Sequence, residues 1–337
     1  MSASPPPPEN EEGSFIQPDS NYQSFEDEVH GDDESDRSSL TSLTSTILKG
    51  TVEGGRTYAV YGKEEYGLPM DEAELDRIDM CHVKYTTLTG KRKFLAPVSD
   101  PHRILDLGCG TGVWSVEMAE DFPSAVVTGV DVAPTQPNWV PPNCSFELDD
   151  IERDWTWKES SFDFIFGRDL LLAIRDWPNL IDQAYTHMKP GGWVEFQAIV
   201  GVLGCDDDSI PEDAHVRKFS DLMEKASSQF GASLTDPMRW KGWLEARGYT
   251  NVTEKVFKLP FNPWAKDPRM KLLGMWEMEN LLTGLEAMVT RMFQKGLGWS
   301  QEEVIIFLAL LRKEIKNTKL HGYWPYYVVY AQKPEEP

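Results

Sequence analysis

Three glycines at alternate positions, Gly108, Gly110 and Gly112, separate two segments of different character. The run before them, Ile104 to Leu107, is typical of a short buried parallel strand, and Val113 to Asp121 after them is typical of a helix. A turn of this kind lets a ligand approach the main chain, because glycine has no Cβ to stand in the way. It also directs free N–H groups at the helix N-terminus toward an anionic group. The turn predicts a nucleotide-like ligand without saying which one.

An acidic residue ends the next predicted strand, Val126 to Asp131. Asp131 lies nineteen residues after Gly112, the spacing of the carboxylate that binds ribose hydroxyls in nucleotide-binding folds. Asp131 could also be an acidic loop residue without a ligand. The glycine turn upstream favours the ribose role.

Two more predicted strands end in charged residues. A third short strand ends at Asp149 and Asp150, and a fourth, Ser161 to Phe166, is followed by Arg168. In open α/β sheets the carboxyl edge of the strands binds ligands, and Arg168 could hold a carboxylate there through charge-assisted hydrogen bonds. A structural ion pair with Asp169 or Asp176 is equally compatible with the sequence.

His82 lies on the apolar stripe of a helix that begins after Asp71 and contains Ile78 and Tyr85 at spacings of three and four. A hydrogen-bonded core histidine is the favoured interpretation, and a group near the active site is the alternative. His82 is the only candidate general base we take from the sequence. Nothing in the spacing shows that it reaches an acceptor, so the catalytic base stays unknown.

Alternating strands and helices predict an α/β fold with a doubly wound sheet. Residues 1–46 hold eleven Asp or Glu and a single Arg, and we expect this acidic tail to be disordered. Residues 47–98 are expected to form an N-terminal cap or lid. Residues 99–337 are expected to form the main domain, with helical insertions at about 205–247 and 265–320.

The composition narrows the classes of partner. The net charge is −22 and no basic stripe is visible, so direct nucleic-acid binding is disfavoured. Four cysteines without C-x-x-C spacing suit a reducing compartment. The apolar run from Ile305 to Leu311 is too short to span a bilayer, and no signal peptide is evident. We expect no membrane association, no metal, and a cytoplasmic location with the nucleus as an alternative.

The glycine turn, Asp131, Asp150 and Lys189-Pro-Gly-Gly192 occur in one order and together resemble the class I S-adenosylmethionine (SAM)-dependent methyltransferases. From about Gly54 to the C-terminus the chain is closer still to the fungal LaeA-like methyltransferases. The segments that carry this likeness include Gly55-Arg56-x-Tyr58, Gln136-Pro-x-Trp139 and Asp176-Trp177. The resemblance implies a Rossmann-like, seven-stranded sheet whose last strand is antiparallel, with SAM as cofactor and a helical cap over it.

The resemblance also assigns residues to the cofactor. An acid at the end of the third strand would accept from the adenine amino group, and the next N–H would meet a ring nitrogen. Asp150 followed by Ile151 is the better match, with Asp149 second. Tyr66 and the helix at 71–88 would cap the site. The expected cofactor-binding residues are Asp106, Gly108, Cys109, Gly110, Asp131, Val132, Asp149, Asp150, Ile151, Arg168 and Tyr66.

Two functions follow from this resemblance. The first is transfer of a methyl group to a small-molecule acceptor in fungal secondary-metabolite biosynthesis. The second is a LaeA-like nuclear regulator acting with velvet-type partner proteins. Ala59 and Met70 stand where the family often has His and Asn, which leaves acceptor recognition open. A dehydrogenase using NAD(P) is disfavoured, because Val113 stands where that fingerprint wants Gly.

Overall fold

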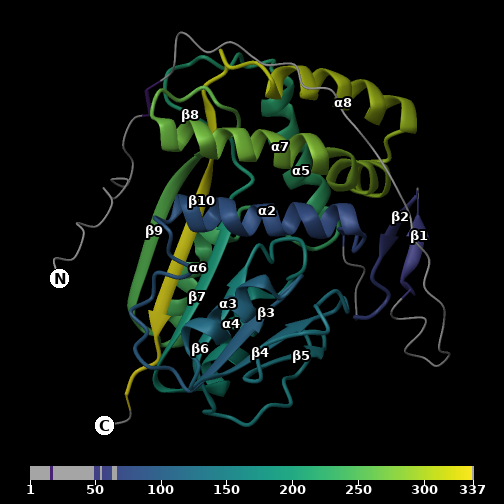
Figure 1. Cartoon of the computed structure of the whole chain (residues 1–337). Coiled ribbons are helices and arrows are strands. Elements are labelled where there is room, and N and C mark those ends of the chain that lie inside the picture. Colours follow the sequence, from purple (N-terminus) through teal and green to yellow (C-terminus); the bar gives the residue numbers. More distant parts are fainter. Residues whose placement is uncertain (1–15, 18–48, 54, 63–66, 336–337) are drawn as a thin grey trace.

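A mixed sheet runs through the centre of the molecule and carries helices on both faces (Figure 1). The computed structural model describes residues 16–17, 49–53, 55–62 and 67–335. Its strands are β1 (Thr51–Glu53), β2 (Arg56–Tyr58), β3 (Arg103–Leu107), β4 (Val126–Asp131), β5 (Cys144–Leu148), β6 (Phe162–Arg168), β7 (Met188–Ile199), β8 (Gly204–Cys205), β9 (Thr250–Pro260) and β10 (Gly322–Gln332). Its helices are α2 (Glu72–Leu88), α3 (Val113–Asp121), α4 (Trp177–His187), α5 (His215–Gln229), α6 (Pro237–Arg247), α7 (Pro268–Arg291), the π-helix η1 (Met292–Gly296) and α8 (Gln301–Ile315).

The strands of the sheet follow the order β5-β4-β3-β6-β7-β10, and β8 and β9 both pair with β10. Neighbours from β5 to β7 are parallel, whereas β10 is antiparallel to β7, β8 and β9. This confirms the predicted doubly wound α/β sheet with an antiparallel last strand. The predicted number of strands was wrong by one. The extra strand is β8, whose two residues pair with Gly322 and Tyr323, too short a segment to show a period in the sequence.

The aromatic alternation in β6 is interrupted. Phe164 and Phe166 pack with Trp114 of α3 on one face of the sheet, and the rings of Trp114 and Phe166 stack 4.0 Å apart. Phe162 packs with Ile165 in the cluster on the other face. The register between β6 and β7 shifts between Phe162 and Phe164, and a bulge of this kind changes the face that a side chain meets.

The cap consists of the β1–β2 hairpin and α2, which lies across the carboxyl edge of the sheet (Figure 1). Asp71 caps α2 by accepting from the Glu74 N–H at 3.3 Å and pairs with Arg56 at 2.6 and 2.8 Å. The Glu74 carboxylate pairs with Arg77. On the other side, α2 packs against α7 through a buried ion pair of Lys84 and Glu277 at 2.5 Å.

The helices after β8 divide into two groups. The helix α6 packs on β7, β9, β10 and α4, so it covers one face of the sheet. The helix α5 packs against α8 and η1, and α7 packs against α2. The stretch 205–247, expected to be a helical insertion, thus contains α5, which packs among the later helices, and α6, which packs on the sheet.

The acidic tail falls mostly outside the described residues, with Ile16 and Gln17 as exceptions. Ile16 is 8% exposed and packs with Tyr85, Trp264 and Met270. The N–H of Lys266 donates to the Gln17 carbonyl at 2.6 Å. Ile16 therefore packs on the core although the tail was expected to be unpacked, whereas Gln17 is exposed and takes part only through its carbonyl.

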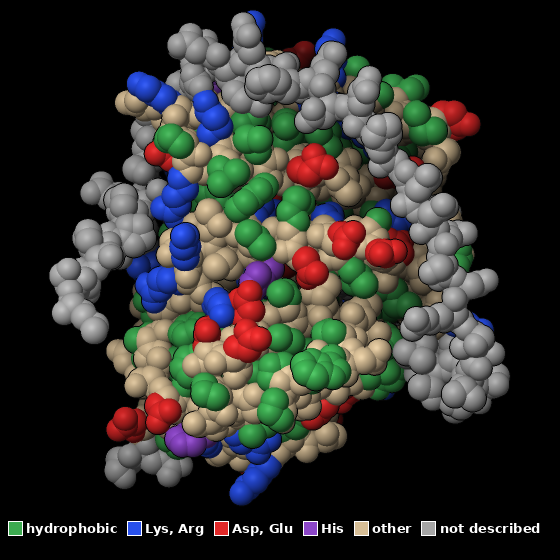
Figure 2. Space-filling view, in the orientation of Figure 1, with side chains coloured by type: hydrophobic (Ala, Val, Ile, Leu, Met, Phe, Trp, Pro, Cys, Tyr) green, Lys and Arg blue, Asp and Glu red, His purple; other side chains and the backbone are tan. Residues whose placement is uncertain are grey.

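The charge on the face seen in Figure 2 is unevenly distributed. Acidic side chains lie over the middle of this face, whereas Lys and Arg lie mostly toward one edge (Figure 2). Within the described residues, no helix has both the length and the apolar character needed to cross a membrane.

Candidate functional site

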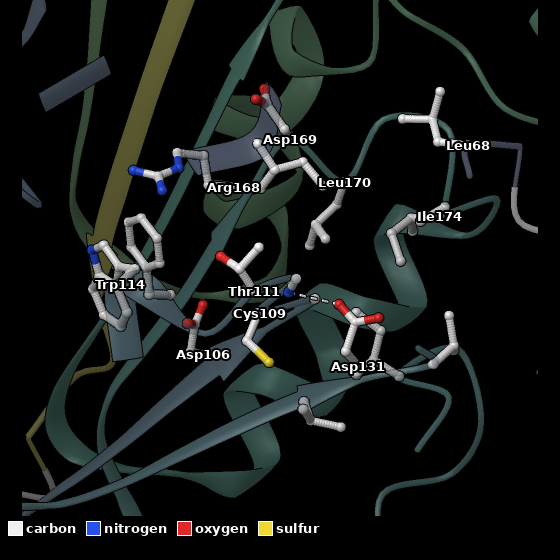
Figure 3. Close-up of a pocket in the computed structure, with 18 of the residues that line it drawn as sticks. Leu68, Asp106, Cys109, Thr111, Trp114, Asp131, Arg168, Asp169, Leu170 and Ile174 are labelled. Carbon is white, nitrogen blue, oxygen red and sulfur yellow. Dashed lines mark hydrogen bonds between the residues drawn. The ribbon is translucent and has the colours of Figure 1, made fainter. Parts of the chain in front are cut away.

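A cavity that is open to solvent lies where the carboxyl ends of β3, β4, β5 and β6 face α2. Figure 3 shows Asp106, Cys109 and Asp131 in its lower part and Leu68, Leu170 and Ile174 in its upper part. The predicted residues that line it are Asp106, Gly108, Cys109, Gly110, Asp131, Val132, Asp149, Asp150, Ile151, Arg168 and His82. Tyr66, the remaining prediction, lies outside the described residues. The structure thus brings eleven of the twelve into one cavity.

The glycine turn has the expected strand-to-helix geometry. Gly108, Gly110 and Gly112 have φ angles of +62°, +55° and +79°, the left-handed region that favours glycine. A Cβ on Gly112 would stand 2.4 Å from the Phe146 ring, whereas a Cβ on Gly110 would find its nearest neighbour, Ile78, at 3.6 Å. Gly112 is therefore required by packing, and Gly110 leaves open space beside the cavity.

The N–H groups of this turn are not free for an anion. Cys109 donates to the Val130 carbonyl at 3.0 Å, and Gly112 donates to the Cys109 carbonyl at 2.9 Å. Gly110 donates to the Asp131 carboxylate at 2.8 Å. These three N–H groups are therefore engaged within the protein, because the turn closes on itself. The N–H groups at the start of α3, to which the expectation of anion binding referred, are not among them.

Asp131 reaches from the end of β4 to the turn. Its two oxygens accept from Gly110 and from Ala133, each at 2.8 Å. Burial raises the pKa of this carboxyl, opposed by backbone hydrogen bonds from Ala133, Gly110 and Val132. A carboxylate offers about four acceptor positions, so the three backbone donors leave capacity for a hydroxyl donor from the cavity.

The next strand end supplies the acids at 149 and 150. Asp149 accepts from the Asp150 N–H at 2.8 Å and from the Tyr61 hydroxyl of the cap at 3.4 Å. Asp150 is 9% exposed and accepts from the Glu152 N–H at 3.0 Å. Both carboxylates and Ile151 line the cavity.

Asp106 lies beneath the turn and is 3% exposed. Burial raises the pKa of its carboxyl to about 7, although the Ser115 hydroxyl donates to it at 2.6 Å and Arg168 opposes the shift. Asp106 can therefore carry a proton near neutral pH.

Arg168 leaves the sheet at the end of β6 and lines the cavity. The expected ion pair with Asp169 or Asp176 is absent from the described part of the chain. Asp176 instead accepts from the Asn179 N–H at the start of α4, and Asp169 points away from Arg168 (Figure 3). The hydrogen-bond partner of Arg168 is the imidazole of His82 at 2.9 Å.

His82 satisfies both interpretations that the sequence left open. It is 4% exposed and hydrogen-bonded, and it also lines the cavity. Burial, followed by the nearby Arg168, lowers its pKa to about 4. Its other ring nitrogen lies 3.1 Å from Glu117 of α3. Because both nitrogens have partners, His82 is a poor candidate for the general base.

The sequence identified the helix at 71–88 as a cap but, apart from His82 and Tyr66, not the individual residues that form the cap side of the cavity. They come from the cap and from the segment after β6, and those that line the cavity include Gly62, Leu68, Arg77, Ile78, Cys81, Tyr85, Leu170, Ala173 and Ile174. A signal existed for two of them, since Ile78 and Tyr85 belong to the stripe on α2 assigned to packing. Asp79 joins α2 to the turn, because the Thr111 hydroxyl donates to it at 2.6 Å.

Metal ligation is not indicated by the described residues, which contain no group of three or more His, Cys, Asp or Glu side chains placed to hold an ion. All four cysteines are free, and three of them are buried.

Comparison with known proteins identifies the family of this chain. Residues 82–254 match the family model described as a methyltransferase domain. The chain is 37% identical over 300 residues to the methyltransferase pytC of Aspergillus terreus, covering 88% of this chain and 92% of pytC. It is 34% identical over 292 residues to the secondary metabolism regulator LAE1 of Cochliobolus heterostrophus, covering 85% of this chain and 95% of LAE1.

Among solved structures, a putative methyltransferase from an antibiotic biosynthesis pathway of Anabaena variabilis superposes with a TM-score of 0.47 at 16% identity. The superposition covers 69% of this chain and 92% of that protein. The family match and the extent of the relatives' identity, rather than this superposition, identify the chain. It belongs to the methyltransferase-domain family and is a SAM-dependent methyltransferase.

Proposed function

We propose that this cavity binds SAM and that the enzyme transfers its methyl group to a small-molecule acceptor in fungal secondary-metabolite biosynthesis. The observation that carries the proposal is the continuity of the cavity. One space is lined both by the polar strand ends and by the partly apolar residues of the cap side. A cofactor held at the strand ends would therefore lie beside a second, apolar surface that can receive a small molecule.

The strand ends supply the cofactor side of the proposal. Asp131 receives the ribose hydroxyls through the acceptor capacity that its backbone donors leave. The segment 149–151 receives the adenine, and the Tyr61 hydroxyl at 3.4 Å from Asp149 brings the cap to this end of the site. Tyr61 precedes the expected Tyr66 by five residues. The missing Cβ of Gly110 leaves space for the cofactor beside the turn.

Methyl transfer from SAM requires the protein mainly to position the acceptor against the methyl group. When bound, SAM supplies a methyl group on a positively charged sulfur that is already electrophilic. The enclosing residues of α2 and of the segment after β6 align the acceptor and exclude water. Alignment alone can lower the barrier by up to roughly 7–11 kcal/mol. Since His82 has both nitrogens engaged, alignment rather than general-base catalysis carries the rate acceleration in this proposal.

Calorimetry with Asp131→Ala tests the cofactor side. We expect SAM affinity to fall about 100-fold or more, since two charge-assisted hydrogen bonds of about 1.5–3 kcal/mol each are lost. Asp131→Asn retains an acceptor oxygen toward Gly110 and should bind SAM with intermediate affinity. Circular dichroism controls for folding. Unchanged SAM affinity in a folded Asp131→Ala protein would place the cofactor elsewhere.

The acceptor side is tested with methyl-labelled SAM and fungal host extract, with Asp131→Ala as the inactive control. Label in an extractable small molecule supports the proposal. Label only in protein, or none in any fraction despite SAM binding, contradicts it.

A second candidate is a regulatory role with velvet-type partner proteins, and the similarity to LAE1 over 95% of that regulator's length supports it. The two functions differ in place, since the first is proposed for the cytoplasm and the second for the nucleus. Co-purification of a velvet-type protein with the tagged full chain, together with nuclear fluorescence, would favour the second.

A further inference from the structure

The guanidinium of Arg168 is half-buried beside the cavity with most of its hydrogen-bonding capacity unused. Arginine has five N–H donors, and one of them meets His82 at 2.9 Å. The rings of Tyr85 and Phe166 lie 5.7 and 5.9 Å from its central carbon. Among the described residues no carboxylate forms an ion pair with Arg168. Its charge interacts with the buried Asp106 carboxyl without a hydrogen-bonded ion pair, so most of its donors remain available to a ligand in the cavity.

A free guanidinium in such a position has a preferred ligand. Its planar fork of donors matches the two oxygens of a carboxylate, and the resulting pairs are short and directional. The flanking aromatic rings limit the directions in which the side chain can turn. The arrangement is that of a receptor for one carboxylate.

The orientation of this receptor depends on His82. Arginine can only donate, so the Nδ1 atom of His82 must accept, and the ring must be neutral with its proton on Nε2. Glu117 of α3 lies 3.1 Å from that Nε2 and can only accept when ionised. The carboxylate thus fixes the tautomer that Arg168 requires, as partners of metal-bound histidines do.

Glu117 is itself held from the far side. Lys93 pairs with it at 3.2 Å and with Asp121 at 2.8 Å. A chain of contacts therefore runs from the surface through Lys93, Glu117 and His82 to the guanidinium of Arg168. Along this chain Lys93 pairs with the Glu117 carboxylate, His82 Nε2 donates to that carboxylate, and Arg168 donates to His82 Nδ1.

We propose that Glu117 and His82 are positioning residues that hold the Arg168 guanidinium toward the cavity as the receptor for a ligand carboxylate. The inference rests on the proposed SAM site. It assigns a role in ligand binding to the buried His82, which takes no part in the methyl transfer itself. The carboxylate has two sources, the methionine moiety of SAM and the methyl acceptor. The experiment below separates them.

The probes are S-adenosylhomocysteine and its decarboxylated analogue, which keeps the amine and lacks only the carboxylate. Calorimetry on the full-length protein gives the preference for the first over the second. With a carboxylate from SAM, we expect a wild-type preference of about 10- to 100-fold, the size of one charged hydrogen-bonded contact.

Four variants show which residues produce this preference for the probe with the carboxylate. Arg168→Met should remove it, leaving both probes at the wild-type affinity for the decarboxylated one. His82→Phe should reduce it several-fold, and His82→Gln, which can accept from Arg168 and donate to Glu117, should restore most of it. Glu117→Met should resemble His82→Phe. A merely structural role for His82 would weaken both probes equally and leave their ratio unchanged.

Arg175→Met is the matched control. Arg175 also lines the cavity, but it already pairs with Glu152 at 3.1 Å, so this variant should keep the preference for the carboxylate. If the preference survives Arg168→Met while the KM of the methyl acceptor rises about tenfold and that of SAM does not change, the carboxylate is the acceptor's. If neither the preference nor that KM changes, the proposal is wrong. Failure of the wild-type protein to bind either probe would instead contradict the proposed SAM site.

Discussion

The two sides of the cavity are built in different ways. The cofactor side consists of the glycine turn and the acids that end β4 and β5, each set by a few neighbouring residues. The cap side joins α2 to the segment after β6, and it is held by contacts with α7 between residues about two hundred positions apart. A cofactor that many enzymes share can be held by a short local pattern. The acceptor surface depends on how distant elements pack.

The largest effect should come from breaking the cap side at its buried ion pair. Lys84 and Glu277 are 0% and 2% exposed in their side chains. Lys84→Met would leave the Glu277 carboxylate buried without its counter-charge, which typically costs about 3–5 kcal/mol of unfolding free energy. Urea denaturation measures the loss.

The double variant Lys84→Met/Glu277→Leu is the control, because replacing a buried pair with apolar residues is often neutral. We expect it to recover most of the stability. A single variant as stable as the wild type would mean that α2 does not depend on α7. In folded samples, turnover with the acceptor should suffer more than SAM affinity, since the pair anchors the cap and not the strand ends.

A smaller effect distinguishes two glycines of the cofactor side. Gly112→Ala places a Cβ 2.4 Å from the Phe146 ring at φ +79°, and we expect a loss of about 2–4 kcal/mol from left-handed strain and overpacking. Gly110→Ala, at φ +55° with 3.6 Å of space, should lose about 1–2 kcal/mol but bind SAM more weakly.

Thermal unfolding and calorimetry on both alanine variants test this distinction. Equal stability losses would show that the Phe146 ring moves to accept the added methyl group. Unchanged SAM affinity in Gly110→Ala would show that the cofactor does not approach the turn at Gly110.

The difference between the locally built cofactor side and the cap side, which depends on distant contacts, also explains how much of the structure could be predicted from the sequence. The α/β sheet followed from apolar runs, glycines and acids at strand ends, which are local patterns, whereas its antiparallel last strand was implied by the family resemblance. Leu68, Leu170 and Ile174 gave no signal, because an apolar residue in a loop looks the same whether it meets a ligand or the core. The partner of Arg168 could not be chosen either, since Asp169 and Asp176 are near in sequence while His82 is near only in space. The short strand β8 exists because β10 extends far enough to pair with it.

His82 connects the two sides, since it belongs to α2 and contacts Glu117 of α3 and Arg168 of β6. Its pKa in the folded protein is lowered to about 4, first by burial and then by Arg168, against about 6.5 in the unfolded chain. Protonation therefore favours the unfolded state. The stability that His82 contributes is complete above pH 6.5 and declines as the pH falls toward 4. Between pH 7.5 and pH 5 this amounts to about 2 kcal/mol.

Urea denaturation of the wild type and of His82→Gln at pH 5, 6 and 7.5 isolates this contribution, because glutamine does not titrate. Burial raises the pKa values of Asp106 and Glu195 to about 7, so these two carboxyls make the fold more stable as the pH falls, opposite to His82. Both are present in the wild type and in the variant, so their contributions cancel in the difference between the two proteins. The wild type should lose stability relative to the variant as the pH falls. Parallel curves would mean that water or movement of α2 relieves the charge. The contact between the cap and the cofactor side would then be looser than the chain of contacts to Arg168 requires.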